Sequence, residues 1–255
     1  MYAEERHLSI ADLLTQRGRL SVTELAEKFA VTTETVRRDL STLERAGVVR
    51  RVHGGAIRAA SPSRLEHAVS ERDLTHADRK DRVANAAVAF LPADGGSVLL
   101  DAGTTTARLA GLLPLDLAFT VFTNAVPIAG RLASRSNVEL HLLPGRVRRT
   151  TQAAVGEDTV AAISRLRTDL AFVGTNGLSL AHGLSTPDQS EAAAKQAMVG
   201  SALRVVVLTD SSKIGRESTV RFAELDQVDV VITDDEISDE DRLSLTGNGI
   251  EVVVA

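Results

Sequence analysis

The sequence predicts an α/β protein with a small N-terminal helical domain and a larger domain built on a mostly parallel β-sheet. Three observations favour this fold class. Short segments with helical periodicity fill the first 45 residues, a stretch with Pro, Ser and mixed charge follows at 59–75, and seven β-branched runs then alternate with helical stretches. Continuous apolar strands that alternate with helices are typical of a parallel sheet covered on both faces.

Three short helices are expected at the N-terminus. The first covers residues 4–17, and the second opens with a capping box formed by Ser21 and Glu24. The third follows a break at 30–32. Its apolar side is formed by Val36, Leu40 and Leu43.

The stretch "VVRRVHGGAIR" contains two short β-prone runs on either side of His53-Gly54-Gly55, which indicates a hairpin. Three helices followed by such a two-stranded wing are typical of a winged helix-turn-helix, which we expect over residues 1–58. The alternative is a small helical bundle with no role in DNA binding. Arginines on both the third helix and the wing favour DNA binding. The candidate DNA contacts are Thr33, Thr35, Arg37, Arg38, Ser41, Arg50, Arg51, His53 and Gly54.

Charge is unevenly distributed along the chain. The whole protein has a formal net charge of -5, yet residues 1–60 carry 10 Arg or Lys against 8 Asp or Glu, and the remainder is acidic. A local basic excess on an acidic body fits a small DNA-facing module. On a helical wheel Glu34 and Arg38 form an i, i+4 surface pair. We expect Arg38 to reach the groove and Arg37 and the wing to contact phosphates.

The larger domain is expected over residues 76–255, after a linker at 59–75. It begins with an amphipathic helix in "ADRKDRVANAAVAFLPADGG", and further helical stretches cover 104–113 and 188–201. The seven predicted strands are "SVLLD", "AFTVFT", "VELHLL", "DLAFVG", "RVVVLT", "DVVIT" and "IEVVVA".

Ligands of open α/β sheets bind beyond the carboxyl ends of the strands, and polar residues gather at these ends here. In "DAGTTT" a glycine precedes a helix N-terminus with three hydroxyls, which favours an anion such as phosphate. A nucleotide P-loop is excluded because no Gly-Lys-Ser/Thr follows. The alternative is an ordinary capped helix. The candidate ligand contacts are Asp101, Gly103, Thr104, Thr105, Thr106, Thr123, Asn124, Gly174, Asn176, Gly177, Asp210 and Lys213.

Other charged residues are weaker candidates. Arg146, like Lys213, could neutralise a second anionic or hydroxyl-bearing part of the ligand. Glu191 and Lys195, four residues apart on a helix, are either weaker candidates for the same site or a routine surface pair. His182 lies in a Gly-rich loop and fits a structural or lid-like role. No histidine shows metal-ligand spacing and no catalytic triad is evident, so we expect no metal, no cofactor and no catalytic residues.

The absence of cysteine excludes disulfides, thiol chemistry and zinc sites with Cys ligands, and it fits a reducing compartment. No apolar stretch approaches the roughly 20 residues needed to cross a bilayer. The start "MYAEERHLSI" lacks the apolar core of a signal peptide. We therefore expect a cytoplasmic protein without a membrane partner.

Several motifs together resemble one family. "VTELAEKFAVTTETVRRDLSTLERAGVVRRVHGGA" resembles the DNA-binding signature of the DeoR family of bacterial sugar-metabolism repressors. "LLDAGTTT", "FTN", "TDLAFVGTNGLSLAHGLSTPD" and "LTDSSKIGR" resemble that family's effector domain, whose fold is similar to ribose-5-phosphate isomerase and glucosamine-6-phosphate deaminase. The resemblance covers essentially the whole chain.

The resemblance implies roles for particular residues. Arg37 and Arg38 match the recognition helix, and the wing is matched by Arg51, His53, Gly54 and Gly55. The phosphate-binding loop is matched by Asp101, Gly103 and Thr104 to Thr106, and the late Asp-Ser-Ser-Lys element by Asp210 and Lys213. At the third strand end Pro144-Gly145-Arg146 replaces the family's Gly-Gly, so Gly145 and Arg146 are not carried over as ligands.

The implied function is that of a repressor of a sugar uptake or catabolism operon. Its partners would be double-stranded operator DNA and a phosphorylated sugar such as fructose 1-phosphate, because "MYAEERH" and "RGRLSVTELAEKF" resemble the fructose-operon branch. Two-fold symmetric operators imply a homo-oligomer, a dimer or a tetramer. The rival is a sugar-phosphate isomerase or deaminase with an appended DNA module, for which Asp101, Asp169 and Asp210 are the available bases.

Overall fold

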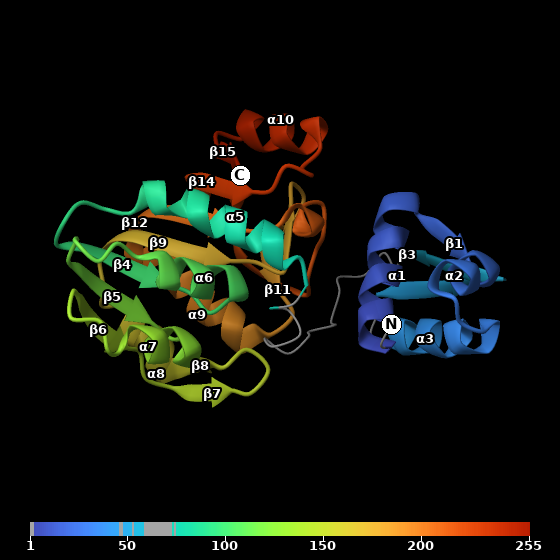
Figure 1. Ribbon diagram of the computed structural model, residues 1–255, viewed down its shortest axis with the longest axis horizontal. Coiled ribbons are helices and arrows are strands. Elements are labelled where there is room, and N and C mark those ends of the chain that lie inside the picture. The colour runs from blue at the N-terminus through green and yellow to red at the C-terminus, as the bar shows by residue number, and fades with distance from the viewer. Residues whose placement is uncertain (1–2, 46–47, 53, 59–72, 74) are drawn as a thin grey trace. The chain divides into compact units, whose positions relative to one another are not determined.

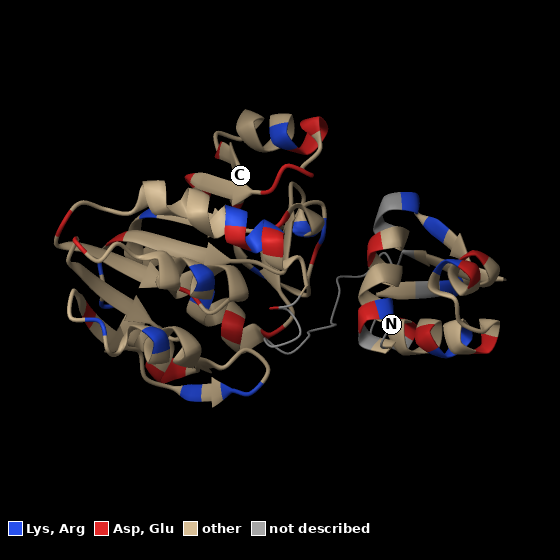
Figure 2. Cartoon of the chain, in the orientation of Figure 1, with Lys and Arg blue, Asp and Glu red and all other residues tan. Residues whose placement is uncertain are grey.

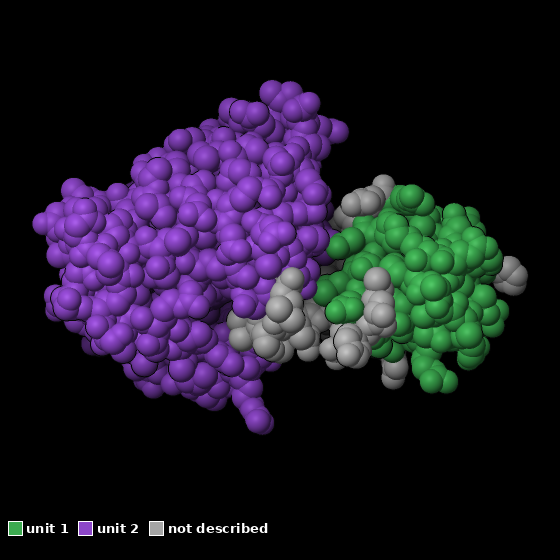
Figure 3. Space-filling view, in the orientation of Figure 1, with its two compact units in different colours: residues 1–66 green, residues 67–255 purple. Residues whose placement is uncertain are grey.

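The structure is a computed structural model that describes residues 3–45, 48–52, 54–58, 73 and 75–255. It divides into two compact units, Met1–Glu66 and His67–Ala255 (Figure 3). Nearly all of the expected linker at 59–75 lies outside the described residues. The expected boundaries at 58 and 76 therefore stay predictions.

The first unit combines three helices with a small antiparallel sheet in the order β1-β3-β2 (Figure 1). The helices are α1 (Ala3–Arg17), α2 (Val22–Phe29) and α3 (Thr33–Arg45), and the strands are β1 (Arg19–Ser21), β2 (Val49–Val52) and β3 (Gly55–Arg58). The expected helices and hairpin are present. The prediction of a two-stranded wing was incomplete, because β1 adds a third strand before α2.

Strand β1 is too short to give a sequence signal, and it shares a residue with a helix cap. Ser21 pairs with Gly55 in the sheet, and its hydroxyl accepts a hydrogen bond from Glu24 N at the start of α2. The expected capping box is therefore confirmed. A Cβ at Gly55 would lie 2.1 Å from the carbonyl oxygen of Leu20, so only glycine permits this close strand pairing.

The core of the first unit is formed by the expected apolar faces. Val36 and Leu40 are fully buried and Leu43 is 1% exposed. The helices are also joined by a buried ion pair, because Arg6 Nε lies 2.5 Å from Asp39 Oδ2. Since Arg6 falls on the apolar side of α1, this pair links α1 to α3 within the core.

The second unit is built on a seven-stranded sheet in the order β15-β14-β12-β9-β4-β5-β6, and every neighbouring pair is parallel. All seven predicted strands are confirmed. Their bounds are β4 Gly96–Leu100, β5 Phe119–Thr123, β6 Val138–Leu142, β9 Thr168–Gly174, β12 Ala202–Leu208, β14 Val230–Thr233 and β15 Glu251–Val254.

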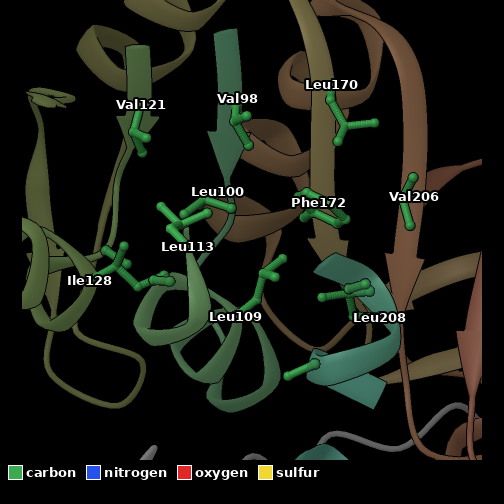
Figure 4. Close-up of a cluster of buried hydrophobic side chains, with 14 of the residues drawn as sticks. Val98, Leu100, Leu109, Leu113, Val121, Ile128, Leu170, Phe172, Val206 and Leu208 are labelled. Carbon is green, nitrogen blue, oxygen red and sulfur yellow. The ribbon is translucent and has the colours of Figure 1, made fainter. Parts of the chain in front are cut away.

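Helices cover both faces of this sheet, as expected for apolar parallel strands. They are α5 (Ala77–Ala87), α6 (Thr104–Leu112), α7 (Val126–Leu132), α8 (Glu157–Ile163), α9 (Gln189–Ser201) and α10 (Asp239–Gly247). Alternate strand residues enter two separate apolar clusters. Leu100 and Phe172 pack with Leu109 of α6 and Ile128 of α7 (Figure 4), whereas Leu99 and Val173 pack with Ile163 of α8, Met198 of α9 and Leu245 of α10.

Short antiparallel elements follow some of the parallel strands, and the sequence did not predict them. β7 (Arg146–Arg148) and β8 (Ala153–Val155) form a hairpin after β6. β10 (Gly177–Ser179), β11 (Gly183–Thr186) and β13 (Val220–Ala223) form a three-stranded sheet. Three residues separate the end of β6 from β7, and two separate the end of β9 from β10. These elements therefore lie next to the carboxyl edge of the parallel sheet.

Candidate functional site

The exposed side of α3 carries the candidate DNA contacts. Thr33, Arg37 and Arg38 are exposed, and Thr35 and Ser41 are partly buried. The expected pairing of Glu34 with Arg38 is wrong: Glu34 Oε2 lies 3.5 Å from Arg37 Nη1, an i, i+3 pair. Among the described residues no ion pair engages Arg38. Its guanidinium is therefore available to another partner.

The wing is joined to α3 through Arg51. Its backbone N–H donates to Glu44 Oε1 at 2.9 Å, and its Nη1 donates to Ser41 Oγ at 3.0 Å. Ser41 Oγ in turn donates to the carbonyl of Arg37 at 2.8 Å. These contacts bring Arg51 and the arginine-bearing face of α3 together. Both signs of charge occur along α3 (Figure 2).

The structure describes the other three candidate wing residues to different extents. Gly54 is exposed with φ +79°, a backbone conformation that favours glycine, and its carbonyl accepts from Val22 N at 2.9 Å. The side chain of Arg50 and the whole of His53 lie outside what the structure describes.

In the second unit the expected ligand residues gather at one edge of the sheet. Asp101 follows β4, Asn124 follows β5, Asn176 lies just after β9, and Asp210 lies just after β12. Strands β12, β9, β4 and β5 are consecutive in the sheet, so their carboxyl ends are neighbours. Asp101, Asn124 and Asp210 are each at most 2% exposed. Such burial is unusual for polar side chains and points to a shared polar site.

The N-terminus of α6 at this edge is open. Gly103 stands at the N-cap position and no side chain caps the helix. Thr106 Oγ1 donates back to the Gly103 carbonyl at 3.0 Å. The hydroxyls of Thr104 and Thr105 make no hydrogen bond to any described residue, although both side chains are buried. The first turn of α6 therefore presents uncapped N–H groups and two hydroxyls to an acceptor.

Asn124 supplies the complementary group. Its Nδ2 donates to the Ala154 carbonyl at 2.9 Å, but its Oδ1 is buried and has no hydrogen-bond partner among the described residues. A buried amide oxygen without a donor is energetically costly, by about 1–3 kcal/mol. A ligand hydroxyl would satisfy it. By contrast, the hydroxyl of Thr123 already makes hydrogen bonds within the protein. Its Oγ1 donates to Leu100 O at 2.7 Å and accepts from Ala125 N at 3.1 Å.

Asp101 is fixed by Lys195 of α9. Lys195 Nζ pairs with Asp101 Oδ2 and also donates to the Gly174 carbonyl at 2.9 Å, while Gly174 N donates to the same carboxylate oxygen at 2.9 Å. The Nζ atom also lies 5.4 Å from the ring centroid of Phe222. Burial raises the pKa of Asp101 above its ordinary value, and the Lys195 ammonium opposes this shift.

Glu191 belongs to a different buried cluster. Its Oε2 lies 3.2 Å from Arg148 Nη1 and accepts from Thr186 Oγ1 at 3.2 Å. The Thr186 hydroxyl is also 3.1 Å from Asn176 Oδ1. The alternative of a surface pair between Glu191 and Lys195 is therefore wrong, because both residues are 5% exposed and each has a partner on another element.

Arg148 of β7, which contacts Glu191, was missed because the sequence drew attention to its neighbour Arg146. Arg146 is exposed and makes no ion pair among the described residues. A weak signal for Lys195 was present, since only four residues of the chain are lysine.

A second charged cluster surrounds Asp210. Its Oδ2 lies 2.8 Å from Lys213 Nζ, and Ser212 Oγ donates to its Oδ1. Burial raises the pKa of Asp210, but the ammonium of Lys213, the hydroxyl of Ser212 and the nearby charge of Lys80 outweigh it and hold the pKa well below its usual range. Lys80 is 3% exposed on α5, where its Nζ donates to the Thr75 carbonyl at 2.7 Å. The sequence offered no signal for Lys80 beyond the rarity of lysine.

Known proteins resemble this chain along its whole length. A family model described as the DeoR-like helix-turn-helix domain matches residues 6–61, and one described as the DeoR C terminal sensor domain matches residues 75–235. The HTH-type transcriptional regulator GlpR of Haloferax volcanii is 37% identical over 253 residues, which cover 99% of this chain and 98% of that protein. The chain belongs to the DeoR family.

Other members of the DeoR family are similar over nearly the same span. The HTH-type transcriptional regulator FruR of Bacillus subtilis is 35% identical and covers 92% of this chain and 93% of its own length. The glycerol-3-phosphate regulon repressor of Escherichia coli is 31% identical and covers 92% of both chains. Among solved structures, ribose 5-phosphate isomerase A of Methanocaldococcus jannaschii aligns with a TM-score of 0.41 at 19% identity, over 55% of each chain.

The two matched DeoR domains contain the two candidate sites. The arginines of α3 and β2 fall in the helix-turn-helix domain, and the polar edge of the sheet falls in the sensor domain. Gly177 and Asp169 also have structural roles in the fold. Gly177 lies so close to Arg216 that a Cβ would stand 2.6 Å from its carbonyl oxygen. Asp169 is the second residue of β9, at the opposite edge of the sheet, where its carboxylate accepts a hydrogen bond from Ser97 N at 2.8 Å.

Within the described residues there is no cluster of three or more His, Asp or Glu side chains that could hold a metal ion. The helices of the described part are also all too short or too polar to span a membrane.

Proposed function

We propose that this DeoR-family chain represses an operon for sugar uptake or catabolism and leaves its operator when a phosphorylated sugar binds the sensor domain. The observation that carries the proposal is the open N-terminus of α6, together with a buried and unpartnered Asn124 Oδ1 at the end of the neighbouring strand β5. One site thus offers N–H and hydroxyl donors for a phosphate and an acceptor for a sugar hydroxyl.

The phosphate would be held without a basic side chain. Thr104 and Thr105 add their hydroxyls to the backbone N–H groups of the first turn, and the helix dipole favours negative charge there. Sugar hydroxyls would donate to Asn124 Oδ1 and to the carboxylate of Asp101. The ion pairs Asp101–Lys195 and Asp210–Lys213 hold these side chains in position before the ligand binds. Less conformational entropy is therefore lost on binding.

The DNA-facing side would use α3 in the major groove. Arg38, which has no ion pair among the described residues, is our candidate for a base contact. Arg37 and Arg51 are held by Glu34 and Ser41, so we assign them to the phosphate backbone. Two-fold symmetric operators are read by dimers or by pairs of dimers, and we propose that the protein acts as a dimer or a tetramer.

A short path joins the ligand site to the segment before α5. Arg108 of α6 donates from Nη1 to the Thr104 carbonyl at 3.1 Å and pairs with the carboxylate of Asp73. Its Nε also lies 2.7 Å from Asp81 Oδ1 on α5. A ligand that shifts the first turn of α6 would therefore act on the start of the sensor domain, which is one physical basis for a shift between DNA-bound and released states.

The choice of sugar is a separate part of the proposal. The curated relatives include proteins named for fructose and for glycerol 3-phosphate regulation, and the resemblance of the N-terminal sequence favours fructose 1-phosphate. We therefore propose fructose 1-phosphate as the first effector to be tested.

A thermal-shift screen of the full chain tests the sensor half. A ligand present at 100 times its dissociation constant stabilises the folded state by about 2.7 kcal/mol. We expect fructose 1-phosphate or another phosphorylated sugar to raise the melting temperature, and the same sugar without phosphate to leave it unchanged. No rise with any phosphorylated sugar would contradict the assignment.

We propose no enzymatic role. Of the three carboxylates available to an isomerase, Asp169 lies at the far edge of the sheet, and Asp101 and Asp210 are each held by a lysine ammonium. A general base needs a free carboxylate near the substrate carbon. Turnover of any aldose or ketose phosphate by the purified chain, lost in Asp210→Asn, would favour the rival instead.

A further inference from the structure

The outer edge of β6 is open. β6 is the last strand of the seven-stranded sheet, and it pairs with β5 on one side only (Figure 1). Among the described residues no strand pairs with its other side. The strand "VELHL" contains neither proline nor lysine, two residues that often protect exposed edges from pairing. Leu142 at its end is 54% exposed. The edge is therefore suited to receive another strand.

The hydrogen bonds to β5 show which backbone groups face outward. Asn137 O accepts from Phe119 N at 3.0 Å, and Leu143 N donates to Thr123 O at 2.8 Å. Since successive residues of a strand alternate, the odd-numbered residues of β6 face β5. Val138, Leu140 and Leu142 therefore direct their N–H and C=O groups to the open edge. Val138 N donates to the Arg135 carbonyl at 3.2 Å, but no such bond engages the N–H of Leu140 or Leu142 within the described chain.

The sequence of β6 is self-complementary in one antiparallel register. When two copies are centred on Leu140, Leu140 faces its own counterpart and Val138 faces Leu142. Glu139 then faces His141 twice, once on each side of the centre. All three apolar residues share one face and both polar residues share the other, because side chains alternate. In this register no apolar residue lies opposite a polar one.

The polar residues are placed for such a contact. The side chains of Glu139 and His141 are 72% and 46% exposed, and His141 Nε2 lies 3.3 Å from Glu139 Oε1 within the chain. The His141 ring is stacked on Phe122 with centroids 4.6 Å apart. This stacking holds the imidazole on the surface of the sheet. Residues opposite one another in an antiparallel pair have Cβ atoms about 4.5–5.5 Å apart, close enough for a Glu–His contact.

We propose that β6 pairs antiparallel with β6 of a second copy of this chain, about a two-fold axis at Leu140, so that the sheet continues from one copy into the next. The N–H and C=O of Leu140 would bond those of its counterpart, and Leu142 N would bond the partner's Val138 O. A contact of this kind is isologous and closes as a dimer. It needs neither DNA nor sugar.

Charge reversal at exposed positions tests the pairing. In full-length His141→Glu, each of the two Glu–His contacts becomes a Glu–Glu contact. We expect the dimer dissociation constant, measured by sedimentation equilibrium, to rise roughly tenfold or more. The double variant Glu139→Lys with His141→Glu places a Lys–Glu pair at each of the two contacts and should restore the wild-type constant. The control Thr246→Glu, on exposed α10, adds the same charge elsewhere and should leave the constant unchanged.

Cross-linking tests the register, because the natural chain has no cysteine. A mixture of Glu139→Cys and His141→Cys chains, exposed to oxidised glutathione, should give a disulfide-linked dimer. Each variant alone should give little disulfide-linked dimer, because in the proposed register position 139 lies opposite position 141 of the other copy and not opposite its own counterpart. A monomeric wild-type protein, an unchanged dissociation constant in His141→Glu, or equal cross-linking in all three samples would overturn the proposal.

Discussion

The ammonium of Lys195 is buried against the carboxylate of Asp101, and it also binds the Gly174 carbonyl at 2.9 Å. A single side chain of α9 therefore joins the carboxyl ends of β4 and β9 in the centre of the sheet. Asp101 is 1% exposed and Lys195 is 5% exposed, so both charges are largely shielded from bulk water. The geometry of the sensor site depends on this pair.

Lys195→Met should strongly destabilise the sensor domain. Removing one partner leaves the Asp101 carboxylate buried and uncompensated, which costs about 3–5 kcal/mol. Urea denaturation followed by circular dichroism measures the change. Glu251→Gln is the matched control, because it removes an exposed ion pair with Arg204 and should change the free energy of unfolding by at most about 1 kcal/mol. Equal effects of the two variants would show that the buried pair is unimportant.

Thr104→Val combined with Thr105→Val should weaken the binding of the phosphorylated sugar. Each hydroxyl lost from a charged acceptor costs about 1.5 kcal/mol or more, which corresponds to at least tenfold in affinity. Isothermal titration calorimetry measures the loss, and circular dichroism checks that the fold is kept. The control Thr246→Val removes an exposed hydroxyl on α10 and should bind as the wild type does. Undiminished affinity in the double variant would place the phosphate elsewhere.

Stability should decline in mildly acidic solution because of His76, which stands at the N-cap position of α5. Burial lowers the pKa of His76 below its ordinary value of 6.5, as do the charges of Arg79, Lys80 and Lys213, while Asp210 opposes the shift. The unfolded chain therefore binds a proton at a higher pH than the folded protein does. The contribution of neutral His76 to the free energy of unfolding is complete above about pH 6.5, and it is lost as the pH falls through the lowered pKa.

The variant His76→Asn removes this titration and retains a residue that tolerates the left-handed backbone of position 76, where φ is +52°. Unfolding free energies compared between about pH 7.5 and 5.5 should fall more steeply in the wild type than in the variant. Parallel pH profiles would mean that His76 is protonated equally in both states.

Arg51→Ala and Arg38→Ala should have different effects on DNA binding. Loss of a phosphate contact weakens binding to all sequences alike and reduces the salt slope by about one, whereas loss of a base contact costs about 1–3 kcal/mol at the operator only. Fluorescence anisotropy with operator and scrambled DNA separates the two. A selective loss at the operator in Arg51→Ala would contradict the assignment of Arg51 to phosphate.

The sequence predicted the architecture because its signals are local. The seven strands of the sheet are β-branched runs, and the helices of the first unit carry apolar stripes and the capping box of Ser21 and Glu24. The strand ends therefore located Asp101, Asn124 and Asp210 correctly at one edge. Strand β1 was missed because three residues cannot show periodicity.

The partners of these residues were not predictable in the same way. Lys195 and Glu191 are four residues apart on α9, a spacing typical of a surface pair, and nothing local shows that each side chain is buried against another strand. Lys80 and Arg148 meet the site from α5 and β7. Such contacts depend on how distant elements pack, and a single sequence does not record that packing.

In the proposed function, a phosphorylated sugar bound at the α6 N-terminus releases the protein from DNA. This release is tested most directly by fluorescence anisotropy of a labelled fragment of the protein's own promoter, titrated with full-length protein at fixed salt, with and without fructose 1-phosphate. We expect specific binding without the sugar, binding at least about tenfold weaker with it, and no release in the Thr104→Val, Thr105→Val variant. Specific binding that no phosphorylated sugar alters, or release that persists in the variant, would contradict the proposed function.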